Sequence, residues 1–322
     1  MIISWRQAIN NFKFYLPVNV SRWIVAIEGY AHKQILHHLS KKLFISEVIV
    51  LQCCSSNLIR ELADKFLEDP DYGFLEFAIQ DGESLRDEDR LALMEFAKWP
   101  ETRVRLCFDV ADCNFRDLFA DEPKILAARS NQLLQRLSLE KVLTVKTGLK
   151  KTALIDCGAG DWSAHVGQKS DYMLPTGEIE CVPSSVDGNF DIDGWIVGTV
   201  PFGLKFGRIQ PGTLQLTFKR GSVTNIDGKN RELCHDLEST FELVPGLQDA
   251  VELGFGLSRG AVRAARKCEI GCLWHERYLG LHIGLGATLD QANRKTDHHV
   301  DIVFANAQVL NGNAEKLFTW QV

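Results

Sequence analysis

The spacing of apolar residues changes near residue 150, and this change constrains the fold more than any other feature of the chain. Before it, helical and strand patterns alternate, which predicts a layered α/β domain over residues 1–150. The expected strands are Glu47–Gln52 and Arg103–Val110, and the expected helices cover 22–42, 58–66, 84–96 and 124–137.

After residue 150, glycine and short β-rich runs replace the long helical patterns. Gly212–Phe218 and Ser222–Ile226 read as a β-hairpin, and only 231–243 and 246–251 look helical. Because 322 residues exceed what one hydrophobic core usually supports, we expect two domains that meet between residues 145 and 155. The predicted fold class is α/β: an N-terminal layered α/β domain, followed by a β-rich α+β domain over residues 151–322.

The charge balance excludes several classes of partner. A formal net charge of −6 argues against bulk electrostatic binding to nucleic acid or to an anionic membrane. No apolar run approaches the roughly 20 residues that span a bilayer. Charges and amides interrupt the apolar N-terminus, so we expect no signal peptide and a cytoplasmic protein.

The cysteines predict neither a disulfide framework nor a zinc site. Nine is an odd number, and the residues are scattered, so reduced thiols are expected. Cys268 and Cys272, with His275 after them, loosely suggest zinc. A structural zinc site needs a second ligand pair at matching spacing, and the sequence has none.

Two segments of the second half each place an acidic residue beside glycine. Glu178 follows a Pro-Thr-Gly turn, and Glu252 precedes alternate glycines in Glu252-Leu-Gly-Phe-Gly256. Taken alone, the first favours an ordinary surface turn, and the second is at least as typical of a helix end.

Histidines in two later segments are the stronger signal. His282 begins the run His-Ile-Gly-Leu-Gly, and His299 and Asp301 stand two residues apart in an expected strand. Alternate strand residues share a face, so His299 and Asp301 can converge on one point. Two histidines and one carboxylate form a known metal triad, although the isolated His-x-Asp pattern favours a plain His–Asp hydrogen bond at a sheet surface. Together with Glu178 and Glu252, they offer ligands for two divalent ions.

The four segments resemble, in order, the motifs of the aminopeptidase T family of metallopeptidases, which run approximately LPTGEV, ELGIG, HIALG and HID. The resemblance covers about residues 170–305. It implies a homodimer whose metal ligands are Glu178, Glu252, His282, His299 and Asp301, with Glu252 bridging the ions. Ser258 replaces the family's Asn, Glu276 does not align cleanly with the family's acid, and residues 1–150 match no motif.

The resemblance implies a hydrolase that cleaves a peptide or amide bond. Zinc, cobalt or manganese would lower the pKa of a bound water and polarise the scissile carbonyl. A carboxylate would accept the proton of that water, and both Glu252 and Glu276 are candidates for this general base.

Two alternatives stay open. Relatives of the family include a dioxygenase that opens dihydroxypyridine rings, in which two histidines and an aspartate hold one Fe(II), and His282, His299 and Asp301 resemble that set. Such an enzyme would act on a small molecule. The third hypothesis is a non-catalytic peptide-binding protein of a specialised peptide pathway, motivated by the diverged first half and by the segment 274–280.

Overall fold

A computed structural model describes residues 3–27, 29–50, 69–79, 103–148, 151–158, 161–167, 172–200, 202–287 and 296–317. The chain divides into two compact units. The first comprises Met1–Ile125 and His165–Thr176, and the second comprises Leu126–Ala164 and Gly177–Val322. The helices expected at 58–66 and 84–96 lie outside the described residues.

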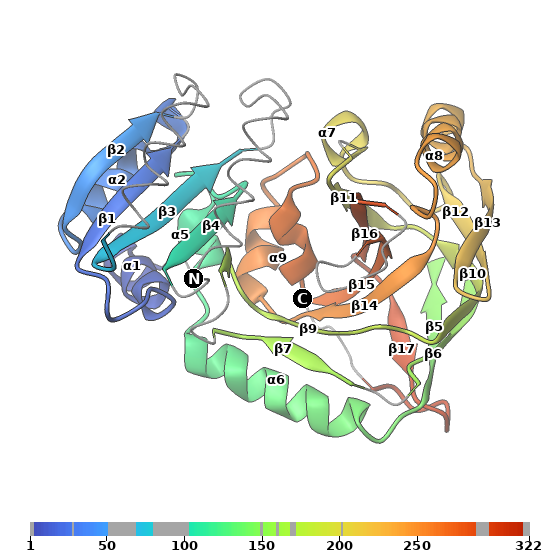
Figure 1. The fold of residues 1–322 in the computed structure, drawn as a ribbon. Coiled ribbons are helices and arrows are strands. Elements are labelled where there is room, and N and C mark those ends of the chain that lie inside the picture. The colour runs from blue at the N-terminus through green and yellow to red at the C-terminus, as the bar shows by residue number, and fades with distance from the viewer. Residues whose placement is uncertain are drawn as a thin grey trace. The chain divides into compact units, whose positions relative to one another are not determined.

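The first unit is built on a parallel sheet (Figure 1) with strand order β2-β1-β3-β4-β8. Its strands are β1 (Arg22–Ile27), β2 (Ile45–Val50), β3 (Tyr72–Ala78), β4 (Val104–Phe108) and β8 (Met173–Leu174). Its helices are α1 (Trp5–Phe14), the 3-10 helix η1 (Gly29–His32), α2 (Lys33–Leu39) and α5 (Phe115–Leu118). The strand predicted over 103–110 is confirmed as β4.

Aromatic rings hold α1, β3 and α5 together. The Phe12 ring of α1 lies 5.5 Å from that of Phe115 and 6.0 Å from that of Phe77, measured between centroids. Asn11 is buried beside them, and its side-chain amide donates to the Phe119 carbonyl at 2.8 Å. This pairing satisfies a polar group that would otherwise be costly to bury.

The single helix predicted over 22–42 is wrong. Residues 22–27 form β1, and the helical segments η1 and α2 follow. Trp23 to Ile27 are all buried, because a central strand of a parallel sheet is covered on both faces. Such a strand is a continuous apolar run without the alternation of period two, and its large residues can match helical spacing.

The second unit contains two antiparallel sheets (Figure 1). One has the order β13-β12-β10-β6-β5-β17, and the other has the order β11-β16-β15-β14-β9-β7. The strands of the first sheet are β5 (Val142–Thr147), β6 (Lys151–Asp156), β10 (Ser185–Asp191), β12 (Gln215–Lys219), β13 (Ser222–Asp227) and β17 (Gln308–Leu310). The strands of the second, here called the site sheet, are β7 (Ser163–His165), β9 (Glu178–Cys181), β11 (Gly194–Gly198), β14 (Ala250–Gly256), β15 (Gly280–Gly286) and β16 (His299–Phe304).

The helices beside these sheets are α6 (Pro123–Leu137), α7 (Phe202–Phe206), α8 (Arg231–Leu243), α9 (Arg259–Ala265) and the 3-10 helix η4 (Leu273–Arg277). The helices expected at 124–137 and 231–243 and the hairpin around Gly221 are confirmed. The helix expected at 246–251 is wrong. Residues 250 and 251 begin β14, and Ala250 pairs with Leu285 of β15.

The predicted α/β class is confirmed, with a parallel sheet first and antiparallel sheets after it. The domain limits 1–150 and 151–322 stay a prediction, and residue 150 falls between β5 and β6, two paired strands of the second unit. None of the helices in the described part of the chain combines the length and the hydropathy needed to span a bilayer.

Candidate metal centre

One face of the site sheet is apolar and the other carries the predicted ligands. On the apolar face, Phe304 of β16 packs against Phe190 of β10 with ring centroids 5.4 Å apart, so this face joins the two sheets. Because strand side chains alternate, the residues next to these apolar ones point to the opposite face. That face bears Glu178 of β9, Glu252 of β14, His282 of β15, and His299 and Asp301 of β16.

Glycines stand between these polar residues in the register of the sheet. His282 is paired with Gly254, and Gly284 is paired with Glu252 on one side and Asp301 on the other. A Cβ on Gly284 would lie 2.8 Å from the Glu252 Cβ and 3.1 Å from Asp301 Oδ1. The missing side chains of Gly254 and Gly284 thus leave space on this face, here called the cradle, in which the larger neighbouring side chains approach one another.

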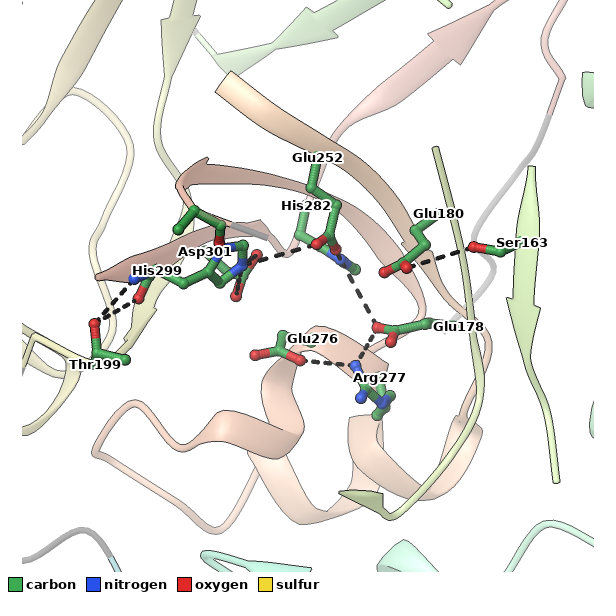
Figure 2. Close-up of polar contacts among 11 residues, drawn as sticks. Ser163, Glu178, Glu180, Thr199, Glu252, Glu276, Arg277, His282, His299 and Asp301 are labelled. Atoms are coloured by element: carbon green, nitrogen blue, oxygen red, sulfur yellow. Dashed lines mark hydrogen bonds and ion pairs between the residues drawn. The ribbon is translucent and has the colours of Figure 1, made fainter. Parts of the chain in front are cut away.

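Among the described residues of the second unit, the polar side chains form two overlapping groups of potential metal ligands, which share Glu252 (Figure 2). His282 Nε2 lies 3.0 Å from Glu252 Oε1, and His299 Nε2 lies 3.8 Å from Glu252 Oε2. His299 Nε2 is also 3.2 Å and 3.1 Å from the two oxygens of Asp301. In each group the donor atoms lie within 4.8 Å of one another.

The orientation of His299 fits a metal ligand. Its Nδ1 lies 2.6 Å from the Ala287 carbonyl oxygen. A carbonyl oxygen can only accept, so Nδ1 carries a proton and the neutral ring has its lone pair on Nε2. That lone pair faces the Asp301 carboxylate, and only a proton or a cation between them makes this arrangement favourable. A backbone carbonyl that fixes the tautomer in this way is typical of metal-bound histidines.

The carboxylates attract positive charge to both imidazoles. Burial lowers the pKa of His282, but the hydrogen bond of Glu252 and the charges of Glu252, Asp301 and Glu178 together outweigh it and raise the pKa to about 9. Burial also lowers the pKa of His299, but the charge and hydrogen bond of Asp301, together with the charges of Glu252 and Glu276, outweigh it and raise the pKa. Burial raises the pKa of Asp301, and the His299 charge reverses this, so the net shift is downward. The donor set therefore fits a cation that replaces these protons.

Glu178 has a different partner. The side chain of Arg277 is 8% exposed, and its Nη1 donates to Glu178 Oε2 and, at 2.7 Å, to Glu276 Oε2. Burial raises the pKa of Glu178 to about 7 although the Arg277 charge lowers it. Burial and the Asp301 charge raise the pKa of Glu276 well above its usual value. A neutral Glu276 carboxyl is consistent with its hydrogen bond to Asp301, which lowers the pKa of Asp301.

The short helix η4 places Glu276 and Arg277 beside the ligand face. His275 of η4 is sandwiched between Trp274 and Trp195, with ring centroids 4.0 Å and 4.3 Å away. Trp195 lies on β11 opposite Val303, which shares its face with Asp301. Burial lowers the pKa of His275 to about 3, so this ring packs as a neutral aromatic group. Ser258, at the family's Asn position, caps α9 by accepting from Ala261 N–H at 3.0 Å.

Thr199, just after β11, holds the backbone of His299. Its hydroxyl accepts from His299 N–H at 3.0 Å and donates to the His299 carbonyl at 3.1 Å. A third bond, from the Thr199 N–H to the same carbonyl, measures 2.8 Å. These contacts fix the start of β16 and with it the direction of the imidazole.

All five predicted ligands and Glu276 therefore gather on one side of the site sheet, and their role in binding a metal stays a prediction. Sequence reasoning missed Arg277, Thr199 and the spacing role of Gly254 and Gly284. A basic residue directly after Glu276 was the one available hint for Arg277. The bonds of Thr199 to His299 span 100 residues, and no local pattern signals them.

Sequence comparisons give no family assignment. The chain matches no protein-family model. A sequence search also finds no similar characterised protein.

Comparison of structures does find a match. The fold is similar to that of 2,5-dihydroxypyridine dioxygenase from Pseudomonas putida KT2440, with a TM-score of 0.63 and 14% sequence identity. The match covers 98% of this chain and 96% of the dioxygenase chain. At this identity the similarity establishes the fold alone.

Proposed function

We propose that the chain is a metal-dependent dioxygenase that opens a dihydroxylated nitrogen ring, with one Fe(II) held by His282, His299 and Asp301. The observation that carries this proposal is the pair of ligand groups that share Glu252, one with His282 and the other with His299 and Asp301 beside Gly284. The fold it shares with a 2,5-dihydroxypyridine dioxygenase supports the same proposed function. Two histidines and one carboxylate with open positions are the ligand set of many non-haem iron oxygenases.

The ion pair between Arg277 and Glu178 favours one metal ion over two. In a two-ion site Glu178 would bind the second ion, and its Oε2 already accepts from the buried guanidinium. A divalent cation at that oxygen would lie beside a buried positive charge, which is strongly unfavourable at low dielectric. Glu252 and Asp301 remain, and their two negative charges match one divalent cation.

Each side chain then has a distinct task. Bound Fe(II) would supply a site where dioxygen and the oxygen atoms of the substrate meet. Glu252 can accept a proton from a substrate hydroxyl at Oε2, the oxygen turned toward His299. Burial raises the pKa of Glu252, which brings its proton affinity closer to that needed near neutral pH. Arg277 holds Glu178 and Glu276 in place through its two ion pairs, and Glu276 in turn hydrogen-bonds to Asp301.

The aminopeptidase-type hydrolase, with zinc, cobalt or manganese and with Glu252 or Glu276 as general base, has less support. The structural comparison supports the dioxygenase alternative instead, and Arg277 occupies the carboxylate that a second ion would use. The peptide-binding hypothesis, the homodimer and the cytoplasmic location remain predictions from the sequence.

Dioxygen consumption tests the proposal. Metal-free protein is loaded with Fe(II) under anaerobic conditions and mixed with 2,5-dihydroxypyridine, its isomers or catechol in oxygenated buffer. We expect uptake of dioxygen with loss of the ring absorbance for at least one of these compounds. His299→Ala should abolish it, whereas His235→Ala, an exposed histidine of α8, serves as the matched control. Chelator-sensitive cleavage of aminoacyl anilides by the zinc, cobalt or manganese form, without oxygen uptake by the iron form, would overturn the proposal.

A further inference from the structure

Two thiols lie next to each other in the loop between α9 and η4. Cys268 Sγ and Cys272 Sγ are 3.5 Å apart, and neither forms a disulfide. The Cys268 thiol can also donate to the Ile270 carbonyl, with its Sγ 3.4 Å from that oxygen. A disulfide requires about 2.05 Å between the sulfurs, so the two atoms must approach by about 1.5 Å.

Cys272 also begins the helix that reaches the metal centre. Its Sγ faces the His275 backbone N–H, which also donates to the Cys272 carbonyl at 2.9 Å, and its own N–H donates to His275 Nδ1 at 2.9 Å. The two side-chain contacts form a capping box, which fixes the first turn of η4. Glu276 and Arg277 follow in the same short helix, so a shift of the Cys272 sulfur would also move these two side chains.

The two thiols differ in exposure. Cys272 is 3% exposed, whereas Cys268 is partly exposed. A small oxidant can therefore reach Cys268 first, with Cys272 as the neighbour that completes the reaction. By contrast Cys157 and Cys181, whose side chains hydrogen-bond to each other, are 2% and 4% exposed and offer no accessible sulfur.

We propose that Cys268 and Cys272 are an oxidisable thiol pair, and that their disulfide displaces η4 and weakens the metal centre. A hydroperoxide is the oxidant: Cys268 sulfur attacks one peroxide oxygen, the O–O bond breaks, and the other oxygen leaves as water or alcohol. The Cys272 sulfur then attacks the resulting sulfenic acid, and its hydroxyl leaves as water with the Cys272 proton. Two thiols and one peroxide thus give one disulfide, and each sulfur loses one electron.

The disulfide acts on the site through the helix start. Formation of the S–S bond draws the Cys272 sulfur toward Cys268 and away from the His275 N–H. Loss of the cap loosens the turn that carries Arg277, and its pairs with Glu178 and Glu276 depend on that turn. Regulation of catalysis by this disulfide rests on the proposed function, whereas the disulfide and the helix displacement do not.

Peptide mapping tests the thiol pair. Metal-free full-length protein is treated with hydrogen peroxide, alkylated and digested with trypsin, which cuts after Lys267 and Arg277 and places both cysteines in one peptide. We expect this peptide to become two hydrogen atoms lighter and to resist alkylation until it is reduced. Cys157 and Cys181 should stay reduced. If both thiols of the peptide are still alkylated while the exposed Cys113 is oxidised, the proposal is overturned.

Hydrogen exchange tests the coupling to η4. We expect faster exchange over residues 272–278 after oxidation, reversed by dithiothreitol and absent in Cys268→Ser, which keeps the Cys272 cap. Cys113→Ser should respond like the wild type. A disulfide without any change in exchange would overturn the coupling. If the reduced protein lacks dioxygenase activity, the proposed function is wrong. Peptide mapping and hydrogen exchange still test the thiol pair, because neither measurement needs turnover.

Discussion

His282 of β15 lies directly opposite Gly254 of β14, and its imidazole Nε2 occupies the space that a Cβ on residue 254 would need. The His282 side chain is 1% exposed, so the ring has no free volume into which it can retreat. The glycine in Glu252-Leu-Gly254 therefore has a physical purpose: it allows an imidazole to lie across the neighbouring strand and reach Glu252.

Gly254→Ala should accordingly weaken metal binding. The added methyl group displaces the His282 ring from Glu252, and we expect a loss of about 10- to 100-fold in metal affinity, as for other changes that misorient a ligand. Overpacking should also cost about 1–3 kcal/mol of stability. Competition with a chromophoric chelator measures the affinity, and thermal unfolding measures the stability. Gly312→Ala is the control, because its nearest neighbour would lie 3.8 Å from the new Cβ. Unchanged affinity in Gly254→Ala would contradict the role of the cradle.

The sequence predicted the parts of this site that depend on one strand alone. His299 and Asp301 share a face because alternate strand residues always do. The pairing of Gly254 with His282 depends on the register of β14 and β15, which are joined through α9 and η4, and no local pattern encodes it. Arg277 was missed for a similar reason, since Glu178 lies 99 positions away. Glu178, Glu252 and His282 stood out beside glycines in the sequence, and the resemblance to a family's motifs implied that they are metal ligands.

In the first unit the sequence was misleading where burial is complete. Val25 and Ala26 are wholly buried in β1, so the strand shows no alternation to distinguish it from a buried helix. The amphipathic helix α6, with one apolar face, was predicted to within one residue at its start. Periodicity thus succeeds where one face meets water and fails where neither does.

Glu178→Gln should leave the number of bound metal ions at one per chain. The amide oxygen of Gln can still accept from Arg277, so the fold should be preserved. Because Arg277 already occupies this carboxylate, the ion held by His282, His299 and Asp301 should be retained. Glu252→Gln is the comparison, and it should lower the affinity for that ion by about tenfold or more. Elemental analysis after loading counts the ions. Two ions in the wild type and one in Glu178→Gln would contradict the single-ion proposal.

Thr199→Val should reduce metal affinity without unfolding the protein. Valine has the same shape but loses both hydroxyl bonds to the His299 backbone, each worth about 0.5–1.5 kcal/mol. We expect an affinity loss of about tenfold, and Thr199→Ser should restore it because the hydroxyl returns. The same chelator competition measures both variants. If valine and serine behave alike, the hydroxyl does not position His299.

Metal binding should release protons, and the apparent affinity should therefore rise with pH. Burial lowers the pKa of His282, but the hydrogen bond of Glu252 and the carboxylate charges around the ring outweigh it and raise the pKa from 6.5 to about 9. Below pH 9 an ion must displace this proton, so affinity should fall about tenfold per pH unit for each proton displaced and level off above it. Calorimetry in two buffers of different ionisation enthalpy counts the protons released. Glu252→Gln removes one of the charges that raise the pKa of His282, so this variant should release fewer protons at neutral pH. A binding heat independent of the buffer would show that metal binding releases no protons from the imidazoles, and hence that they are not the ligands.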